Sequence, residues 1–427
     1  MNKQFISKVK NLKHFLLSQI NKIEKDTIQR NRKINLKHII YTCFNKFINH
    51  SSYSDAVGNL NIDILDLDKN ITTQGFVQRK NNINPDKFLE LNNNILNEIY
   101  KKKTKKYLIV DGSHLHFNKC LEKEGFKSGS NRNTYTKAII SGLKDYDNNI
   151  PINYQLNKNM NEREAFIKQL NYVDVNNILL FDRGYPSNIL IKKLENKNIK
   201  YIIREKKTTL HVRHLIKNNL DEYYFNKNNS KCKVVKYTLN NTSNNKKPME
   251  YYILTNILDM SIEDLKINYA KRWNIETHFK ELKYTTSLGN ITAKTENSVL
   301  QEIYINNLIY ILNSYFKSLF IDYLLIKCND KYKLNEKFCI KTFSCKILSI
   351  LLFKDISFNR KNSDLLNIYK SIIVISNNIY MFSDEYRFTE RIFKGPINKW
   401  KYSKKKIKIK DEDNSENKKV LDEVSII

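Results

Sequence analysis

The sequence predicts an α/β protein, on two observations. Two short apolar runs, residues 107–110 and 177–181, are each followed by an aspartate with a glycine close behind it. These runs alternate with segments in which apolar residues recur at helical spacing, as over 164–170 and 187–196. Strands that alternate with helices are typical of an α/β core whose central strands are buried.

Four regions are expected along the 427 residues. A helical domain is predicted over 1–103, and the α/β core over 104–200 and 256–330. Between the two parts of the core, residues 201–255 alternate apolar and polar side chains between turns rich in Asn, Ser and Lys, which predicts a β-rich insertion. Residues 331–427 are mixed and basic, and they end in a polar tail that we expect to be disordered.

The first region has a pattern that suits DNA binding. Apolar residues recur at helical spacing from Phe5 to Ile20 and again over 36–50. Residues 71–80 place threonine at a helix N-cap before a short basic helix, and Pro85 opens the next helix. A helix, a short turn and a basic helix fit a DNA-docking module. An ordinary helical bundle with a solvated basic face fits the composition equally well.

The charge of the chain points to a polyanionic partner. Lys and Arg number 74 against 44 Asp and Glu, a formal net charge of +30. Such an excess favours nucleic acid, because binding phosphates releases condensed counterions. A codon bias toward Lys, Asn and Ile explains part of the excess.

A membrane and a zinc site are not expected. Residues 1–8 contain no apolar signal-peptide core, and the most apolar long stretch, 303–326, is interrupted by Asn, Lys and Asp. We therefore expect a soluble intracellular protein with no membrane partner. The six cysteines are scattered without a C-x-x-C pair, so reduced thiols are predicted.

The two aspartates are candidates for a metal site. Asp111 precedes Gly112, and Asp182 is followed by Arg183 and Gly184, each at the predicted end of a central strand. Functional groups of open α/β sheets gather at such ends, where glycine lets a ligand approach closely. A single aspartate after a strand is commonly a turn or N-cap residue. Two in the same setting favour a pair of carboxylates that holds Mg²⁺.

A third acid lies on a predicted helix. At about 100° per residue, Arg272, Glu276 and Lys283 lie on the same helical face as Tyr269. Trp273 and Lys280 flank this face. Taken alone, the pattern also fits a solvated amphipathic face with an i,i+4 pair between Arg272 and Glu276.

The spacing Tyr269-x2-Arg272-x3-Glu276-x6-Lys283 matches the Y-R-E-K signature, and the chain thereby resembles a large family of bacterial insertion-sequence transposases of the DDE type. The same family is similar to this chain at Asp111-Gly112, at 182–185, at 254–256 and, more weakly, at 74–79. The resemblance covers about residues 70 to 290 in the correct order. Ser113 departs slightly from the pattern, because threonine is more usual there, but it keeps the hydroxyl.

The resemblance implies a ribonuclease H-like core in which Asp111, Asp182 and Glu276 are the catalytic, metal-holding residues. Two Mg²⁺ ions, for which Mn²⁺ can substitute, would lie roughly 3.5–4 Å apart between them. The implied activity is cut-and-paste transposition by metal-dependent DNA strand cleavage and strand transfer at the ends of the element. The first cut frees a 3′-hydroxyl, which can attack the opposite strand to form a hairpin.

The resemblance also implies DNA-binding residues and partners. Arg272 and Lys283 would clamp phosphates, Tyr269 would hydrogen-bond one, and Trp273 would either stack on a displaced base or belong to the core. Arg183 and Lys280 are further candidates for DNA contact. The expected partners are double-stranded DNA, as terminal inverted repeats and as target, and a second copy of the chain on paired ends, in the cytoplasm and nucleoid of a bacterium.

Two alternatives remain from the sequence. One is a catalytically silent, domesticated descendant that binds DNA. The other is a ribonuclease H-like nuclease that cuts without joining. The intact acids argue against the first, and the basic N-terminal helices argue against the second.

Overall fold

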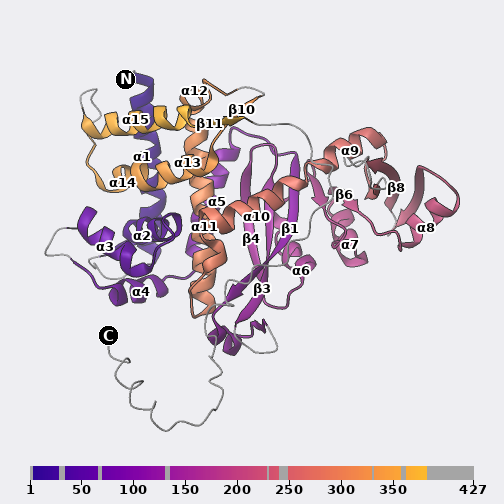
Figure 1. Cartoon of the computed structure of the whole chain (residues 1–427), viewed down its shortest axis with the longest axis horizontal. Helices are drawn as coiled ribbons and strands as arrows, with labels where there is room; N and C mark the ends of the chain where they lie inside the picture. The colour runs from indigo at the N-terminus through magenta and orange to yellow at the C-terminus, as the bar shows by residue number, and fades with distance from the viewer. Residues whose placement is uncertain are drawn as a thin grey trace, which may run out of the picture. The chain divides into compact units, whose positions relative to one another are not determined.

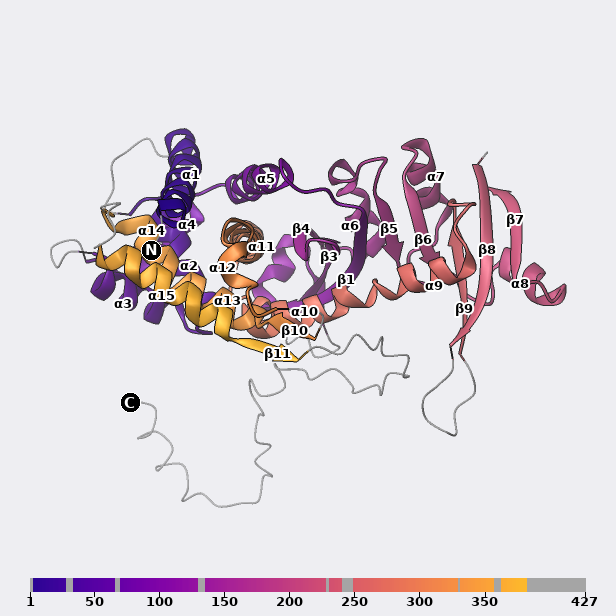
Figure 2. The same cartoon turned by 90° about the horizontal axis from the view of Figure 1, so that it is seen from above.

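A computed structural model of the chain describes residues 3–27, 34–65, 70–129, 135–227, 230–239, 249–328, 331–356 and 362–381. Figures 1 and 2 show it in two views at right angles. The expectation of a disordered tail falls on residues outside these ranges. No helix of the described residues is long and apolar enough to cross a membrane. All six cysteines lie within the described ranges and are thiols, as predicted.

A mixed β-sheet forms the centre of the fold (Figure 1). Its first five strands are arranged in the order β4-β3-β1-β5-β6. The neighbours β4–β3 and β3–β1 are antiparallel, whereas β1–β5 and β5–β6 are parallel. This mixed sheet with helices around it confirms the predicted α/β class. The strands are β1 (Tyr107–Phe117), β3 (Thr136–Asp145), β4 (Ile150–Asn157), β5 (Ile178–Phe181) and β6 (Lys200–Arg204), and β2 (Lys127–Ser128) pairs with β3.

The predicted β-rich insertion is present, and its strands extend the same sheet. Three antiparallel strands continue outward from β6, namely β9 (Met249–Thr255), β8 (Ser230–Leu239) and β7 (Glu222–Lys227). Helix α8 (Leu210–Lys217) packs on them through a small core of its own that includes Val212, Leu215 and Tyr252. The strand β6, at the start of the range expected for the insertion, pairs with the core strand β5.

Strand β1 differs from the expectation. The apolar run was expected to end at Asp111, but β1 continues through it to Phe117. The reason is its neighbour β3, which pairs with β1 from Leu108↔Asp145 to Phe117↔Thr136 and so provides a partner for every residue of the extension. Strand β5 does end at Phe181, so Asp182 lies in a loop as predicted.

Helices cover both faces of the sheet (Figure 2). Neighbouring residues of β3 identify the two faces, because successive side chains of a strand point in opposite directions. The side chain of Ser141 meets Gln169 near α6, whereas the next residue, Gly142, faces Phe279 of α10. These helices and their neighbours are α6 (Glu162–Ile167), α7 (Asn188–Asn196), α9 (Ile262–Ala270) and α10 (Trp273–Thr285), with short helical turns η2 (Lys119–Glu124), η3 (Leu170–Tyr172) and η4 (Leu288–Asn290).

The predicted N-terminal helical region is present and shares a hydrophobic core with helices from the C-terminal part. Phe5, for example, contacts the rings of Phe320, Tyr323 and Tyr369. The N-terminal helices are α1 (Lys3–Thr27), α2 (Leu36–Ile48), α3 (Tyr53–Asp63), α4 (Thr73–Asn81) and α5 (Asp86–Tyr100). The later elements are α11 (Glu296–Leu319), α12 (Ile321–Leu324), α13 (Glu336–Thr342), η5 (Phe343–Ile347), α14 (Leu348–Phe353) and α15 (Ser363–Asn377), with a β10 (Tyr332–Leu334) and β11 (Ile379–Met381) pair.

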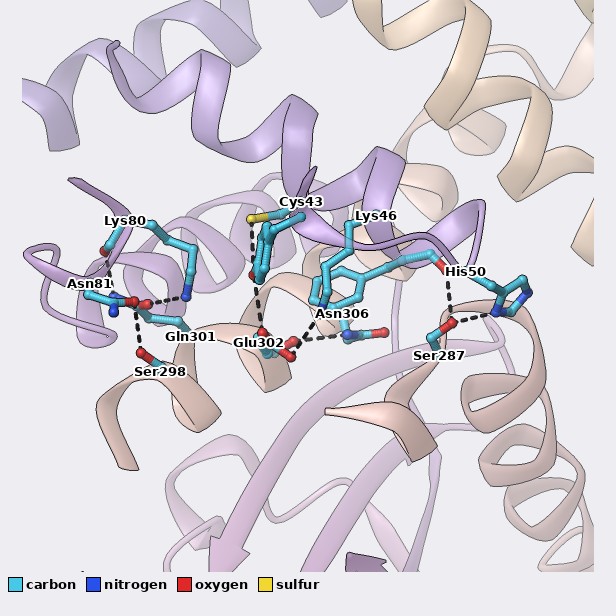
Figure 3. Close-up of polar contacts among 12 residues, drawn as sticks. Cys43, Lys46, His50, Lys80, Asn81, Ser287, Ser298, Gln301, Glu302 and Asn306 are labelled. Carbon is cyan, nitrogen blue, oxygen red and sulfur yellow. Dashed lines mark hydrogen bonds and ion pairs between the residues drawn. The ribbon is translucent and has the colours of Figure 1, made fainter. Parts of the chain in front are cut away.

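Polar side chains join the N-terminal helices to α11 within this core (Figure 3). Lys46 of α2 pairs with Glu302 of α11, with 3.2 Å between Nζ and Oε2, and their side chains are only 5% and 1% exposed. The Tyr53 hydroxyl donates to the other oxygen of Glu302 at 3.1 Å. Lys80 donates to Oε1 of Gln301 at 2.9 Å, and Gln301 returns a hydrogen bond to the Lys80 carbonyl. We call Lys46, Tyr53, Lys80, Gln301 and Glu302 the α11 polar cluster.

Helix α4 is the short basic helix of the predicted DNA-docking module. Thr72 is its N-cap, as predicted, and accepts a hydrogen bond from the Gly75 amide. Phe76 and Lys80 are buried, so one of its cations serves the α11 polar cluster. The DNA-binding role of this region stays a prediction.

Candidate active site

The sheet brings the two aspartates together. The register of β1 with β5 pairs Leu108 with Leu179 and Ile109 with Leu180. Continued for two more residues, this register would place Asp111 next to Asp182, just after β5 has ended. Because neighbouring strands are about 4.8 Å apart, the two carboxylates come from adjacent backbones. The sequence could not show this register, although it marked both residues.

Glu276 reaches the same place from α10. Arg272 connects it to Asp111: its Nη2 lies 2.9 Å from Oε1 of Glu276, and its Nη1 lies 3.8 Å from Oδ2 of Asp111. The i,i+4 pair that was expected on a solvated face is therefore present, but Arg272 is only 7% exposed. Asp111 and Glu276 thus lie around one arginine, and the charge of Asp182 also acts on it.

Burial is the main influence on the charge of Asp111. It raises the pKa of this carboxyl to about 7, and Arg272 is the largest influence in the opposite direction. The Gly112 amide, which donates to Oδ1 at 2.9 Å, also lowers the pKa, while Glu276 and Glu162 raise it. Arg272 therefore only partly offsets the cost of burying this carboxylate.

The Y-R-E-K residues do not lie on one unbroken helix. Helix α9 ends at Ala270 and α10 starts at Trp273, so Tyr269 and Glu276 belong to different elements. Tyr269 is 5% exposed, and its ring lies 5.9 Å from the Arg272 guanidinium carbon. Burial lowers the pKa of Arg272, but Tyr269, Asp182 and Asp111 together raise it above its usual value, so the side chain stays charged.

Lys283 fastens the last turn of α10 to β1. Its Nζ donates to the Ser113 hydroxyl at 2.7 Å and to the His114 carbonyl at 3.1 Å. The hydroxyl that Ser113 keeps, where threonine is more usual, thus has a structural partner. These contacts hold Glu276 and Asp111 in fixed relation, because each lies on one of the two joined elements.

The remaining predicted DNA contacts are exposed side chains. Arg183 and Lys280 are two of them. Trp273 is 44% exposed, which is contrary to the reading of a core tryptophan and leaves its ring accessible. Arg183, Trp273 and Lys280 are therefore placed to meet a ligand, whereas Arg272 and Tyr269 are turned inward.

A fourth acid, Glu162, was not predicted. It is the first residue of α6, and its side chain lies against Gly112: a Cβ atom added there would be 2.6 Å from the Glu162 carboxyl carbon. Burial raises the pKa of Glu162, as does the nearby charge of Asp182. The only sequence signal was an acid beside the helix N-cap Asn161, a setting common to ordinary helices.

The chemistry of these side chains fits a hard divalent cation. Asp111, Asp182 and Glu276 offer carboxylate oxygens, which Mg²⁺ and Mn²⁺ prefer to thiolate or imidazole ligands. In the conformation seen here, no group of three His, Cys, Asp or Glu within the described ranges is close enough to form a metal cluster. Arg272 lies between Asp111 and Glu276.

Comparison with known proteins agrees with this geometry. Residues 102–312, which include all of β1, β5 and α10, match the family model of the transposase DDE domain. The chain carries a DDE-type transposase domain. This confirms the resemblance to DDE-type insertion-sequence transposases, and the matched residues contain Asp111, Asp182, Glu276 and the β-rich insertion between them.

One relative and one solved structure add to the comparison. The relative is assigned as the transposase of insertion sequence element IS4SA from Synechocystis sp., and it is 29% identical over 144 residues. That match spans 32% of this chain and only 40% of the relative. The solved structure is the piggyBac transposase synaptic complex with hairpin DNA, at 12% identity and a TM-score of 0.46 over 87% of this chain and 83% of that one.

Proposed function

We propose that this protein is a DNA transposase that cuts and joins strands at the ends of an insertion sequence, with Asp111, Asp182 and Glu276 as the metal-holding residues. The observation that supports the proposal is the register of β1 and β5, which, continued past Leu180, would bring Asp111 next to Asp182, with Glu276 joined to Asp111 through Arg272. The transposase DDE domain over 102–312 gives this arrangement its reaction class.

Two Mg²⁺ ions, when bound here, would supply an activated water or 3′-hydroxyl and a counter-charge for the leaving oxygen. Asp111 would contribute an oxygen from β1, Asp182 from the loop after β5, and Glu276 from α10. Arg272 holds Asp111 and Glu276 together in the free protein, and it would be released toward a phosphate if these acids held a cation instead. Lys283 holds α10 on β1.

The DNA partner follows from charge and exposure. A net charge of +30 favours a polyanion, and exposed Arg183 and Lys280 flank the acids. Exposed Trp273 offers a ring on which a displaced base can stack. We propose element ends and target DNA as substrates, bound by two copies of the chain, and strand transfer as the second step.

The test is cleavage of DNA that carries the element's own ends. Purified protein is incubated with Mg²⁺ or with EDTA, beside Asp182→Ala and a control, Asp259→Ala, which removes an exposed aspartate. We expect nicking at the element boundary that needs Mg²⁺, persists in the control and disappears in Asp182→Ala. Binding of the ends without any cutting by the unaltered chain would contradict the proposal and favour a non-catalytic descendant.

Joining needs a separate readout. Labelled, pre-cut ends with a free 3′-hydroxyl are mixed with supercoiled plasmid and Mg²⁺. Labelled plasmid is the expected product of a transposase. Efficient cutting with no joining under any condition would instead identify a nuclease.

A further inference from the structure

We infer that Glu162 is a fourth carboxylate ligand of the metal site, on the side of the acids opposite α10. The inference rests on the proposed function, since it assigns a further residue to the same site. Three features carry it: the position of Glu162 over Gly112, the end of β5 that opens the sheet beside it, and the hydrogen bonds by which Arg163 ties the start of α6 to the loop that carries Asp182.

Glu162 occupies space that only a glycine leaves open. An added Cβ at residue 112 would lie 2.6 Å from Cδ, 2.7 Å from Cγ and 2.7 Å from Oε1 of Glu162. Any other residue at 112 would push the Glu162 side chain away, because Cβ contacts this short do not occur. The Glu162 carboxylate is thereby held against the backbone of β1, immediately after Asp111.

The two faces of the sheet meet at the end of β5. Asp111 pairs with Gly142, which faces α10, whereas Gly112 pairs with Ser141, which faces α6. Strand β5 ends at Phe181, so beyond it no strand separates the two faces next to Asp182. Glu162 also lies near the loop that follows: its Oε2 is 3.9 Å from a Cβ added at Gly184. One cation can therefore be reached from both faces.

The neighbouring residue fixes this loop in place. Arg163 donates from Nε and Nη2 to the Gly184 carbonyl, at 3.0 Å and 2.7 Å. The start of α6 is thus tied to the loop that carries Asp182. Burial raises the pKa of the half-buried Glu162 carboxylate, and the charge of Asp182 raises it further, while Arg163 acts in the opposite direction. Glu162 is thus near enough to Asp182 for the two charges to interact.

Tyr185 is buried beside the same acids. It is 1% exposed, and its hydroxyl is close enough to Ser141 for a side-chain hydrogen bond. Burial raises its pKa well above the usual value, and the charges of Glu162, Asp111 and Asp182 raise it further. Glu162 therefore shares its surroundings with both aspartates.

The test measures Mn²⁺ binding to the full chain, by loss of the free-ion electron paramagnetic resonance signal, without DNA and without an activity readout. The variants are Glu162→Gln and Gly112→Ala, with Asp182→Asn as reference. Glu164→Gln is the matched control, because it alters an exposed acid two residues along the same helix. Circular dichroism verifies that each variant is folded.

We expect Glu162→Gln and Gly112→Ala each to raise the Mn²⁺ dissociation constant by about tenfold or more, on the order of losses seen when metal-site groups are removed. Glu164→Gln should bind as the unaltered chain does. If Glu162→Gln binds Mn²⁺ normally while Asp182→Asn does not, the inference about Glu162 is wrong and the proposed function stands. If Asp182→Asn also binds normally, the proposed metal site itself is wrong, and this inference with it.

Discussion

Two groups of inward-facing charges in this protein are built differently. In the α11 polar cluster, Lys46 and Glu302 neutralise each other at 3.2 Å, and Tyr53 occupies the second oxygen of Glu302. Around Asp111, by contrast, one guanidinium is shared: Arg272 lies 2.9 Å from Glu276 and 3.8 Å from Asp111, and burial raises the pKa of Asp111 to about 7. In the first group the buried carboxylate has a cation of its own, whereas in the second two carboxylates share one arginine.

The comparison separates structural from functional charge. A closed pair buried in a core contributes to holding the N-terminal helices on α11, and removing one member leaves an uncompensated charge. An acid cluster in excess costs stability in the free protein, and it persists where a cation or substrate makes up the difference. The two groups should therefore respond in opposite ways to substitution.

The largest expected effect is on catalysis by Asp111→Asn. The substitution removes a metal-holding oxygen, so we expect the cleavage rate at element ends to fall by about 10³-fold or more, equivalent to several kcal/mol of lost metal-ion stabilisation. The midpoint of urea unfolding should stay the same or rise, because one of several like charges is gone. A large fall in both quantities would erase the distinction between the two groups.

Lys46→Met should show the reverse pattern. Glu302 would remain buried without its cation, so we expect the free energy of unfolding in urea to fall by about 3–5 kcal/mol. The double variant Lys46→Met with Glu302→Met should recover most of that loss, since no buried charge is left. Folded Lys46→Met should cut DNA at the rate of the unaltered chain. Equal losses in the single and double variants would show that packing, and not charge, holds α2 on α11.

Lys80→Met sharpens the comparison within the α11 polar cluster. The lysine donates to a neutral amide, and Gln301 keeps its own bonds to the Lys80 and Ile83 carbonyls after the change. The expected loss is about 1.5–3 kcal/mol of unfolding free energy, the range for one hydrogen bond that involves a charged group. A loss as large as that of Lys46→Met would mean that the two lysines act as one unit.

The smallest expected effect is that of Ser113→Ala. Lys283 would lose one hydrogen bond but keep its bond to the His114 carbonyl, so about 0.5–1.5 kcal/mol of stability is at stake. Lys283→Met removes both bonds and should reduce cleavage more than Ser113→Ala does. Equal cleavage rates for both variants would show that Lys283 does not position α10.

Local patterns in the sequence were sufficient to predict the class of the fold and to propose three residues of the candidate site. Asp111 and Asp182 were proposed because each follows a buried apolar run beside a glycine, and Glu276 because its spacing matches a family signature. The N-caps and the alternation of the insertion strands are likewise local features. Each of these depends on residues only a few positions apart.

Long-range features could not be predicted. Lys46 and Glu302 are 256 residues apart, and neither is marked as a partner of the other. Glu162 had the appearance of an ordinary first-turn acid until the fold placed it over Gly112. The extension of β1 past Asp111 depends on pairing with β3, and the break between α9 and α10 occurs without glycine or proline. These outcomes are set by tertiary contacts.

The most direct test of the account is to locate the bound ion. Fe²⁺ is substituted for Mg²⁺ in the full chain, ascorbate and peroxide are added, and the positions of backbone cleavage by locally formed hydroxyl radicals are mapped. We expect cuts close to Asp111, Asp182 and Glu276 that excess Mg²⁺ suppresses and Asp182→Asn abolishes. Cuts confined to other parts of the chain, or cuts at the acids that Asp182→Asn leaves unchanged, would contradict the assignment of this acid cluster as the metal site.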